Sequence, residues 1–121
     1  MSLAYIDITL DKPRRLKYGI RDFRDLERVM GKPVGDVLAD FAKLGAESLA
    51  IICWAGLKHE DRQITPERAA DLIDAYLGSG HDVADLRGAI NEARVLSGYF
   101  GKRAKDEAEA ERTDRPSPPA G

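Results

Sequence analysis

The chain contains few of the residues that most often carry chemistry, with one cysteine and two histidines among its 121 residues. A single cysteine cannot form an intramolecular disulfide. Because Cys53 lies inside an apolar run, we expect a buried hydrophobic side chain there rather than a nucleophile. That run, residues 49–57, is much shorter than the ~20 apolar residues that a membrane helix requires. We therefore expect no contact with a membrane.

The sequence also lacks the motifs of common catalytic sites. No serine stands in a Gly-x-Ser-x-Gly setting, and no glycine-rich loop is followed by the Lys-Ser/Thr pair that cradles a phosphate. The polar residues His59, Glu60 and Asp61 are adjacent, but consecutive side chains diverge and do not make a metal site by themselves. The other histidine, His81, is distant in the sequence. These patterns predict no enzyme activity, no cofactor and no metal.

Charge is nearly balanced over the whole chain but not along it. The formal net charge is −2, whereas residues 12–28 contain seven basic and three acidic residues. Residues 65–92 superficially resemble a helix-turn-helix, but the second helix would start with Asp82 and Asp85, where DNA phosphates require cations. The pattern therefore disfavours nucleic acid. A small nucleic-acid-binding regulator that uses the basic N-terminal hairpin stays open as an alternative.

Alternation of apolar and polar residues predicts an N-terminal β-hairpin at about residues 4–20. The first strand would place four apolar residues on one face, namely Ala4, Ile6, Ile8 and Leu10. Turn residues 11–14 would lead into a second strand over residues 15–20, with Leu16, Tyr18 and Ile20 on one face. A lone hairpin is marginal in water, so its apolar face must pack on the helices or on another chain.

Apolar residues at a helical period predict about five helices after the hairpin. Asp22 is the expected N-cap of the first, which ends at Gly31. Pro33 opens a second helix that stops at Gly45. The third helix, residues 46–58, contains the run that is apolar on every side, which is typical of a helix at the centre of a domain.

Two further helices follow a polar loop. Thr65 and Pro66 form a helix start, and an apolar stripe begins four residues later. The last helix is expected from Val83 to about Ala104, with fraying or a bend after Ser97 because Gly98 and Gly101 interrupt it.

The apolar stripe is absent from residue 105 onward, where a charged stretch leads into a proline-rich end. The predicted architecture is therefore mainly α: a single helical domain over residues 1–104 with the N-terminal hairpin, followed by a disordered, mobile tail over residues 105–121.

The order of several short segments resembles the tail assembly chaperones of long-tailed bacteriophages and the related tail proteins of gene transfer agents. The matching segments lie between residues 4 and 77, and they are Arg15-Leu16-Lys17-Tyr18-Gly19, Leu26-Glu27, Gly31-Lys32-Pro33, Trp54-Ala55-Gly56-Leu57-Lys58-His59-Glu60-Asp61, and Ile64-Thr65 through Leu72-Ile73-Asp74.

The resemblance implies a function that the composition alone does not. It implies a non-catalytic chaperone that binds the tape-measure protein and assists assembly of the tail tube, in the cytoplasm of a bacterial host carrying a phage, prophage or gene transfer agent. The tape-measure protein and the tail-tube protein would be its partners, and self-association into a homo-oligomer along the client would be natural. Some relatives are structural components associated with the tail tube, which is the other function that the resemblance allows.

Large aromatic side chains near helix ends are candidates for protein contacts. Tyr76 ends the apolar stripe of the fourth helix, and Tyr99 and Phe100 stand beside glycines where the last helix loses its regularity. Core packing is the competing fate of Tyr76 and Phe100, so Tyr99 is the best candidate for exposure.

Overall fold

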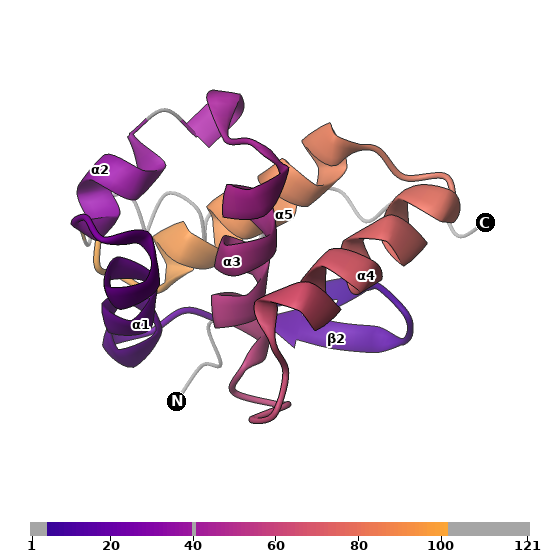
Figure 1. Ribbon diagram of the computed structural model, residues 1–121, viewed down its shortest axis with the longest axis horizontal. Helices are drawn as coiled ribbons and strands as arrows, with labels where there is room; N and C mark the ends of the chain where they lie inside the picture. Colours follow the sequence, from indigo (N-terminus) through magenta and orange to yellow (C-terminus); the bar gives the residue numbers. More distant parts are fainter. Residues whose placement is uncertain (1–4, 40, 102–121) are drawn as a thin grey trace, which may run out of the picture.

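The computed structural model describes residues 5–39 and 41–101, and in this part of the chain it is mainly helical with an antiparallel hairpin at its N-terminal end (Figure 1). The expected tail, residues 105–121, lies outside the described residues. The elements are β1 (Ile6–Thr9), β2 (Pro13–Leu16), α1 (Ile20–Met30), α2 (Val34–Leu38), a short 3₁₀ helix (Phe41–Lys43), α3 (Ala46–Leu57), α4 (Pro66–Gly78) and α5 (Val83–Leu96). The mainly helical fold with five α-helices and a hairpin confirms the prediction.

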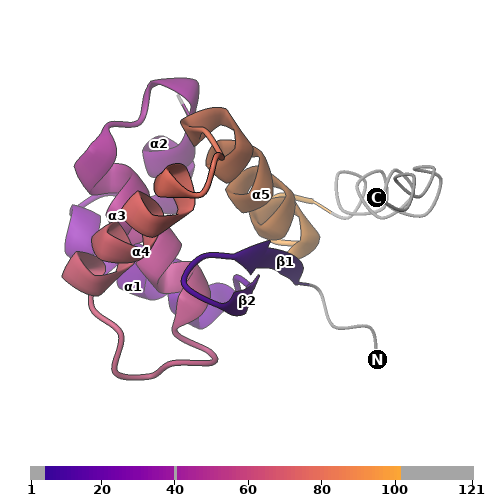
Figure 2. The same cartoon turned by 90° about the vertical axis from the view of Figure 1, so that its right-hand side faces the viewer.

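The central helix is α3, as its uniformly apolar sequence predicts. Its residues from Leu49 to Leu57 are buried, except that Trp54 is partly exposed. The helix packs against α1, α4, α5 and β2, and Figures 1 and 2 show these elements arranged around it. The Trp54 Nε1–H donates a hydrogen bond to the Ile64 carbonyl oxygen at 2.9 Å, which fixes the loop that leads into α4. One helix therefore organises the whole domain.

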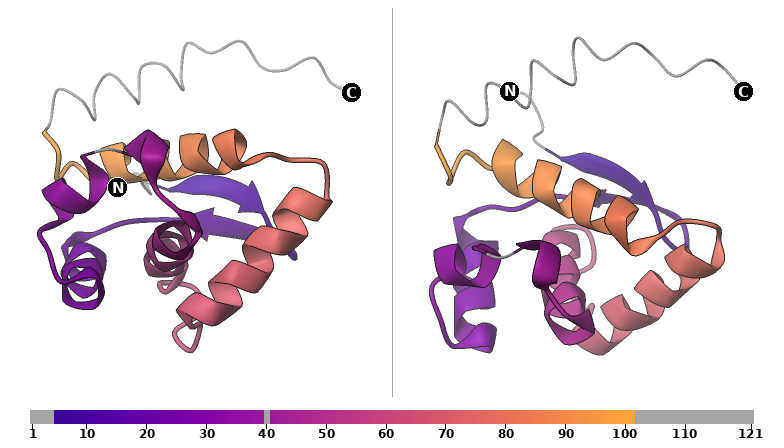
Figure 3. Two further views of the ribbon diagram at one scale, coloured as in Figure 1. Left: turned by 45° about the horizontal axis from the view of Figure 1, so that its top comes forward. Right: turned by 90° about the horizontal axis from the view of Figure 1, so that it is seen from above.

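The hairpin pairs β1 with β2 in a register that places Ile6 opposite Leu16 and Thr9 opposite Pro13. The second strand was expected over residues 15–20, and this is wrong: β2 begins at Pro13 and ends at Leu16, while Ile20 is 67% exposed and starts α1. Proline suits the first residue of a strand because its missing N–H costs no ladder bond there. Figure 3 shows α5 lying alongside the hairpin. The helix contacts both strands and covers the apolar face of the hairpin.

Close packing of β2 on α3 depends on Gly56. A Cβ at this position would lie 2.7 Å from Cζ and 2.8 Å from Oη of Tyr18. The buried Tyr18 hydroxyl donates to the Ile52 carbonyl oxygen at 2.6 Å, and the Lys17 N–H donates to the Gly56 carbonyl oxygen at 3.0 Å. The hairpin is thus joined to α3 by hydrogen bonds as well as by apolar contact.

Two other helix predictions need correction. Asp22 is not the N-cap of α1: Gly19 holds that position, and the Asp22 carboxylate accepts the Gly19 N–H at 2.9 Å from the third helical position. The predicted helix from Pro33 to Gly45 is two separate pieces, α2 and the 3₁₀ helix. Gly35 and Asp36 are weak helix formers, and a helix of about five residues has too few backbone bonds to propagate.

The starts of α4 and α5 and the end of α1 follow from capping residues. The Thr65 hydroxyl accepts the Arg68 N–H at 3.1 Å, and Gly31 ends α1 with φ of 75°, both as predicted. The last helix ends at Leu96 rather than near Ala104, because Gly98 adopts φ of 83° and turns the chain. Within residues 5–39 and 41–101, no helix is both long enough and apolar enough to cross a membrane.

Candidate protein-binding groove

A shallow apolar groove of about 470 Å³ lies between α1, α3 and the start of α4. Most of its lining is aliphatic, contributed by Val29, Ala46, Ala50, Ile51, Pro66 and Ala70. The groove is therefore formed by three elements that are far apart in the sequence.

Small side chains create the hollow. Ala46 and Ala50 are one turn apart on α3, and Ala70 faces them from α4. Alanine leaves space between two packed helices that a leucine or isoleucine would fill. On the α1 side the wall is Val29, which is 49% exposed although it is a large hydrophobic residue. An exposed valine beside a row of alanines is the kind of apolar surface that a partner can cover.

Acidic side chains border this apolar surface. Glu47 lies in the first turn of α3 and Glu67 in the first turn of α4, where the helix dipoles favour negative charge. Both are exposed, and neither has an ion-pair partner in the described part of the chain. The groove thus combines an apolar floor with a negative border.

The aromatic residues predicted to bind protein lie elsewhere. Tyr76 is 6% exposed and stacks on His81 with ring centroids 4.3 Å apart. Tyr99 is 50% exposed, and both it and Phe100 pack on the buried Phe23, at centroid distances of 5.2 and 5.6 Å. These three aromatic residues do not line the groove.

The polar triplet after α3 has a structural task that the sequence did not reveal. The Glu60 carboxylate accepts the Arg15 N–H at 2.9 Å, and His59 Nε2 lies 2.7 Å from the Arg15 carbonyl oxygen. Because a carbonyl oxygen can only accept, His59 Nε2 must carry the proton. The Glu60 and His59 side chains therefore occupy the backbone N–H and C=O of Arg15 on β2. Asp61 Oδ2 lies 3.8 Å from the Arg14 guanidinium of the same strand.

The other residues that suggest chemistry are not assembled into a site. His81 lies against Tyr76, away from His59, and within residues 5–39 and 41–101 no group of three or more His, Cys, Asp or Glu side chains could hold a metal ion. Cys53 is fully buried, as predicted, and this burial raises the pKa of its thiol to about 12. A thiol with that pKa is protonated at neutral pH and is a poor nucleophile.

The groove does not follow from any apolar stripe along the chain, because its lining residues come from three helices that only the fold brings together. The useful signal was the spacing of Ala46 and Ala50, which are small residues one turn apart in the first half of the most apolar helix. Val29 was a second signal, since it is apolar but lies off the stripe of Phe23, Leu26 and Met30.

Comparison with known proteins finds no match for the chain among family models, curated proteins or solved structures.

Proposed function

We propose that this protein is a non-catalytic binding domain that holds an amphipathic helix of a client protein in the groove between α1, α3 and α4. The observation that carries the proposal is the apolar lining, from Val29 across Ala46 and Ala50 to Ala70. The two charged residues that line the groove, Glu47 and Glu67, are exposed. A helix that lays its apolar face into such a groove removes both surfaces from water.

The border of the groove defines the chemistry of the client. Glu47 and Glu67 favour a helix whose apolar stripe is flanked by lysine or arginine, because opposite charges at the rim of an interface steer association and fix orientation. Alanines on the groove floor allow a bulky client side chain, such as leucine or phenylalanine, to enter deeply. We expect anchors at i, i+3 or i+4, and i+7 of the client helix.

The client that agrees with the sequence is the tape-measure protein of a phage, prophage or gene transfer agent tail. One of the segments that resemble tail assembly chaperones, residues 64–74, contains Pro66, Glu67 and Ala70, which form the α4 side of the groove. A tape-measure protein is long and helical, so it offers many amphipathic segments to a chaperone of this kind. In this proposal the protein acts in the host cytoplasm and then yields the client to the tail-tube protein.

Co-expression with the tape-measure protein of the same gene cluster tests both parts of the proposal. The fraction of that protein in the soluble extract is measured with the wild-type chain and with two tryptophan variants of exposed α4 alanines. Ala70→Trp fills the groove, whereas Ala75→Trp adds the same bulk to α4 outside the groove lining. We expect the wild type and Ala75→Trp to keep the client soluble and Ala70→Trp to lose it, with the circular dichroism of all three unchanged.

The two ways of failing are distinguishable. If the wild-type chain does not keep the tape-measure protein soluble, the chaperone function is wrong. If the wild type and Ala70→Trp are equally effective, the chaperone function stands and the groove is not where the client binds.

A further inference from the structure

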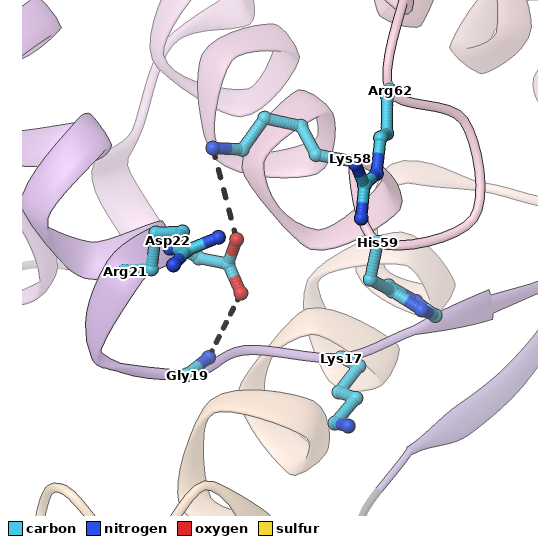
Figure 4. Close-up of a pocket in the computed structure, with 7 residues that line it drawn as sticks. All are labelled: Lys17, Gly19, Arg21, Asp22, Lys58, His59 and Arg62. Atoms are coloured by element: carbon cyan, nitrogen blue, oxygen red, sulfur yellow. Dashed lines mark hydrogen bonds and ion pairs between the residues drawn. The ribbon is translucent and has the colours of Figure 1, made fainter.

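A second cavity, also of about 470 Å³, lies between the start of α1 and the loop that follows α3 (Figure 4). In contrast to the groove, its lining is strongly basic, with Lys17, Arg21, Lys58 and Arg62 as cations and Asp22 as the one carboxylate. Gly19 and His59 complete the lining. The residues come from two stretches that are far apart in the sequence, residues 17–22 and 58–62, so the fold brings these cations together.

One cation of the four is neutralised within the fold. The Lys58 ammonium binds the Asp25 carboxylate and lies 3.7 Å from Asp22 Oδ1. The other Asp22 oxygen accepts the Gly19 N–H at 2.9 Å, so this carboxylate is committed at both ends (Figure 4). Hydrogen bonding and ion pairing with Lys58 lower the pKa of Asp25, which keeps that partner charged. Lys58 and Asp22 are therefore already paired within the fold, and they form part of the cavity wall.

The three remaining cations of the cavity differ from Lys58 in their pairing. Lys17, Arg21 and Arg62 make no ion pair with another residue in the part of the chain that the structure describes. Figure 4 shows Arg21 on the α1 side of the opening and Arg62 with His59 on the opposite side. Like charges that line one cavity repel each other, and an anion bound there would relieve the repulsion.

Arg21 is also at an unfavourable place on its helix. It follows Ile20 in the first turn of α1, where the dipole favours negative charge and disfavours a cation. The first backbone bond of this helix joins the Phe23 N–H to the Gly19 carbonyl oxygen at 3.1 Å, so the preceding N–H groups have no acceptor within the helix. These N–H groups and the Arg21 side chain add positive charge at the helix end where the Asp22 carboxylate accepts the Gly19 N–H.

We propose that this cavity binds the phosphate group of a small molecule. A phosphate dianion accepts several hydrogen bonds from different directions, which suits one lysine and two arginines arranged around an opening. The volume of about 470 Å³ exceeds that of one phosphate and lies within the range of small-molecule sites. A nucleic acid is disfavoured because Glu60 and Asp61 lie on the same loop as His59 and Arg62. The proposal is independent of the groove and its client.

Titration of the ¹⁵N-labelled full chain tests this site by amide chemical shifts at fixed ionic strength. Inorganic phosphate, inorganic pyrophosphate and adenosine monophosphate are the three probes. We expect saturable shifts at Gly19, Arg21 and Arg62, and at least tenfold weaker binding in Arg21→Gln/Arg62→Gln. The control is Arg24→Gln, which removes one exposed arginine of α1 that does not line the cavity and should leave the affinity unchanged. Tighter binding of the nucleotide than of phosphate would identify a phosphorylated metabolite as the ligand, and equal binding would identify the free anion.

Three results would overturn the proposal. The first is a shift that grows linearly without saturation for all three probes. The second is an equal loss of affinity in Arg24→Gln, which would indicate general attraction to a basic surface. The third is tight binding of a short DNA duplex, with a steep dependence on salt, when none of the small phosphates binds.

Discussion

The two ends of the α1 and α3 helix pair differ in chemistry although the same helices build both. At one end, Val29 of α1 and Ala50 of α3 line an apolar groove with a negative border. At the other end, the start of α1 and the end of α3 line a basic cavity. Both ends are open to solvent, but one is suited to an apolar helix with positive flanks and the other to a small anion. Two kinds of ligand can therefore be separated on one small domain.

Helix dipoles account for most of these charges but not for all of them. Glu47 and Glu67 occupy first turns, and Lys58 follows the last residue of α3, so each stands where the dipole favours its sign. Arg21 violates that rule, and only a nearby carboxylate, Asp22, offsets it in part. Charges that agree with the dipole are explained by folding alone. The charge that disagrees with it calls for a functional explanation.

The largest expected effect comes from breaking the close contact between the end of α3 and the residues that follow β2. Gly56→Ala should lower the free energy of unfolding by about 1 to 3 kcal/mol, because the new Cβ overlaps the Tyr18 ring. That ring cannot move cheaply, since its hydroxyl is hydrogen-bonded to the Ile52 carbonyl oxygen. Urea denaturation measures the change.

A matched alanine substitution on α5 provides the control. Gly88→Ala meets no atom within 4 Å, so it should raise the free energy of unfolding by up to about 1 kcal/mol through helix propensity. Equal effects of the two substitutions would show that the close approach of β2 to α3 does not matter for stability.

The next effect separates the two surfaces by charge. Glu47→Lys/Glu67→Lys should weaken client binding about tenfold, or about 1.4 kcal/mol, because the border would then repel a basic flank. The same variant should bind pyrophosphate as the wild type does, since neither residue lines the basic cavity. Retention of the client on an immobilised variant, at low and at high salt, measures the first effect. A change in both client retention and pyrophosphate binding would mean that the two surfaces are not independent.

Much of the helical fold could be predicted from local sequence. The uniformly apolar run indicated α3, and Thr65 with Pro66 marked the start of α4, because these signals involve residues close in the sequence. The start of β2 could not be found in this way. Arg14 is a charged residue that is only 8% exposed, and its paired hydrogen bonds to Asp11, with Asp61 nearby, allow it to lie on the buried face.

The sites were harder to predict for a related physical reason. The groove is formed by side chains from α1, α3 and α4, and the basic cavity by residues from two distant stretches, 17–22 and 58–62. Neither depends on a motif along the chain. The aromatic residues that the sequence suggested are individually well suited to binding. Tyr76, however, is buried in the hydrophobic core and stacks on His81. Tyr99 retains the exposure that was expected of it, so a contact there stays a prediction.

A third effect concerns the cations that the fold neutralises. The Arg14 guanidinium hydrogen-bonds to Asp11 and lowers the pKa of that carboxyl from 3.8 to about 2. Since the folded pKa lies below the unfolded one, the stabilisation is present above pH ~4 and is lost as the pH falls towards 2. Asp11→Asn should remove about 1 kcal/mol at neutral pH, a value reduced for solvent screening. Urea denaturation between pH 2 and pH 5 should show a flatter acid limb in the variant, and an unchanged limb would exclude the ion pair as its cause.

The smallest effect is the most informative about Arg21. If this arginine serves a ligand and not the fold, Arg21→Gln should raise the free energy of unfolding by about 0.3 to 0.5 kcal/mol at low ionic strength, because a cation leaves the positive end of α1. Arginine and glutamine have similar helix propensities, so backbone preference does not obscure the change. Arg24→Gln, farther along the helix, should show no such gain. A variant that is more stable and yet binds phosphate more weakly would show that stability is given up at this position for binding, whereas a loss of stability in Arg21→Gln would mean that the fold itself uses the charge.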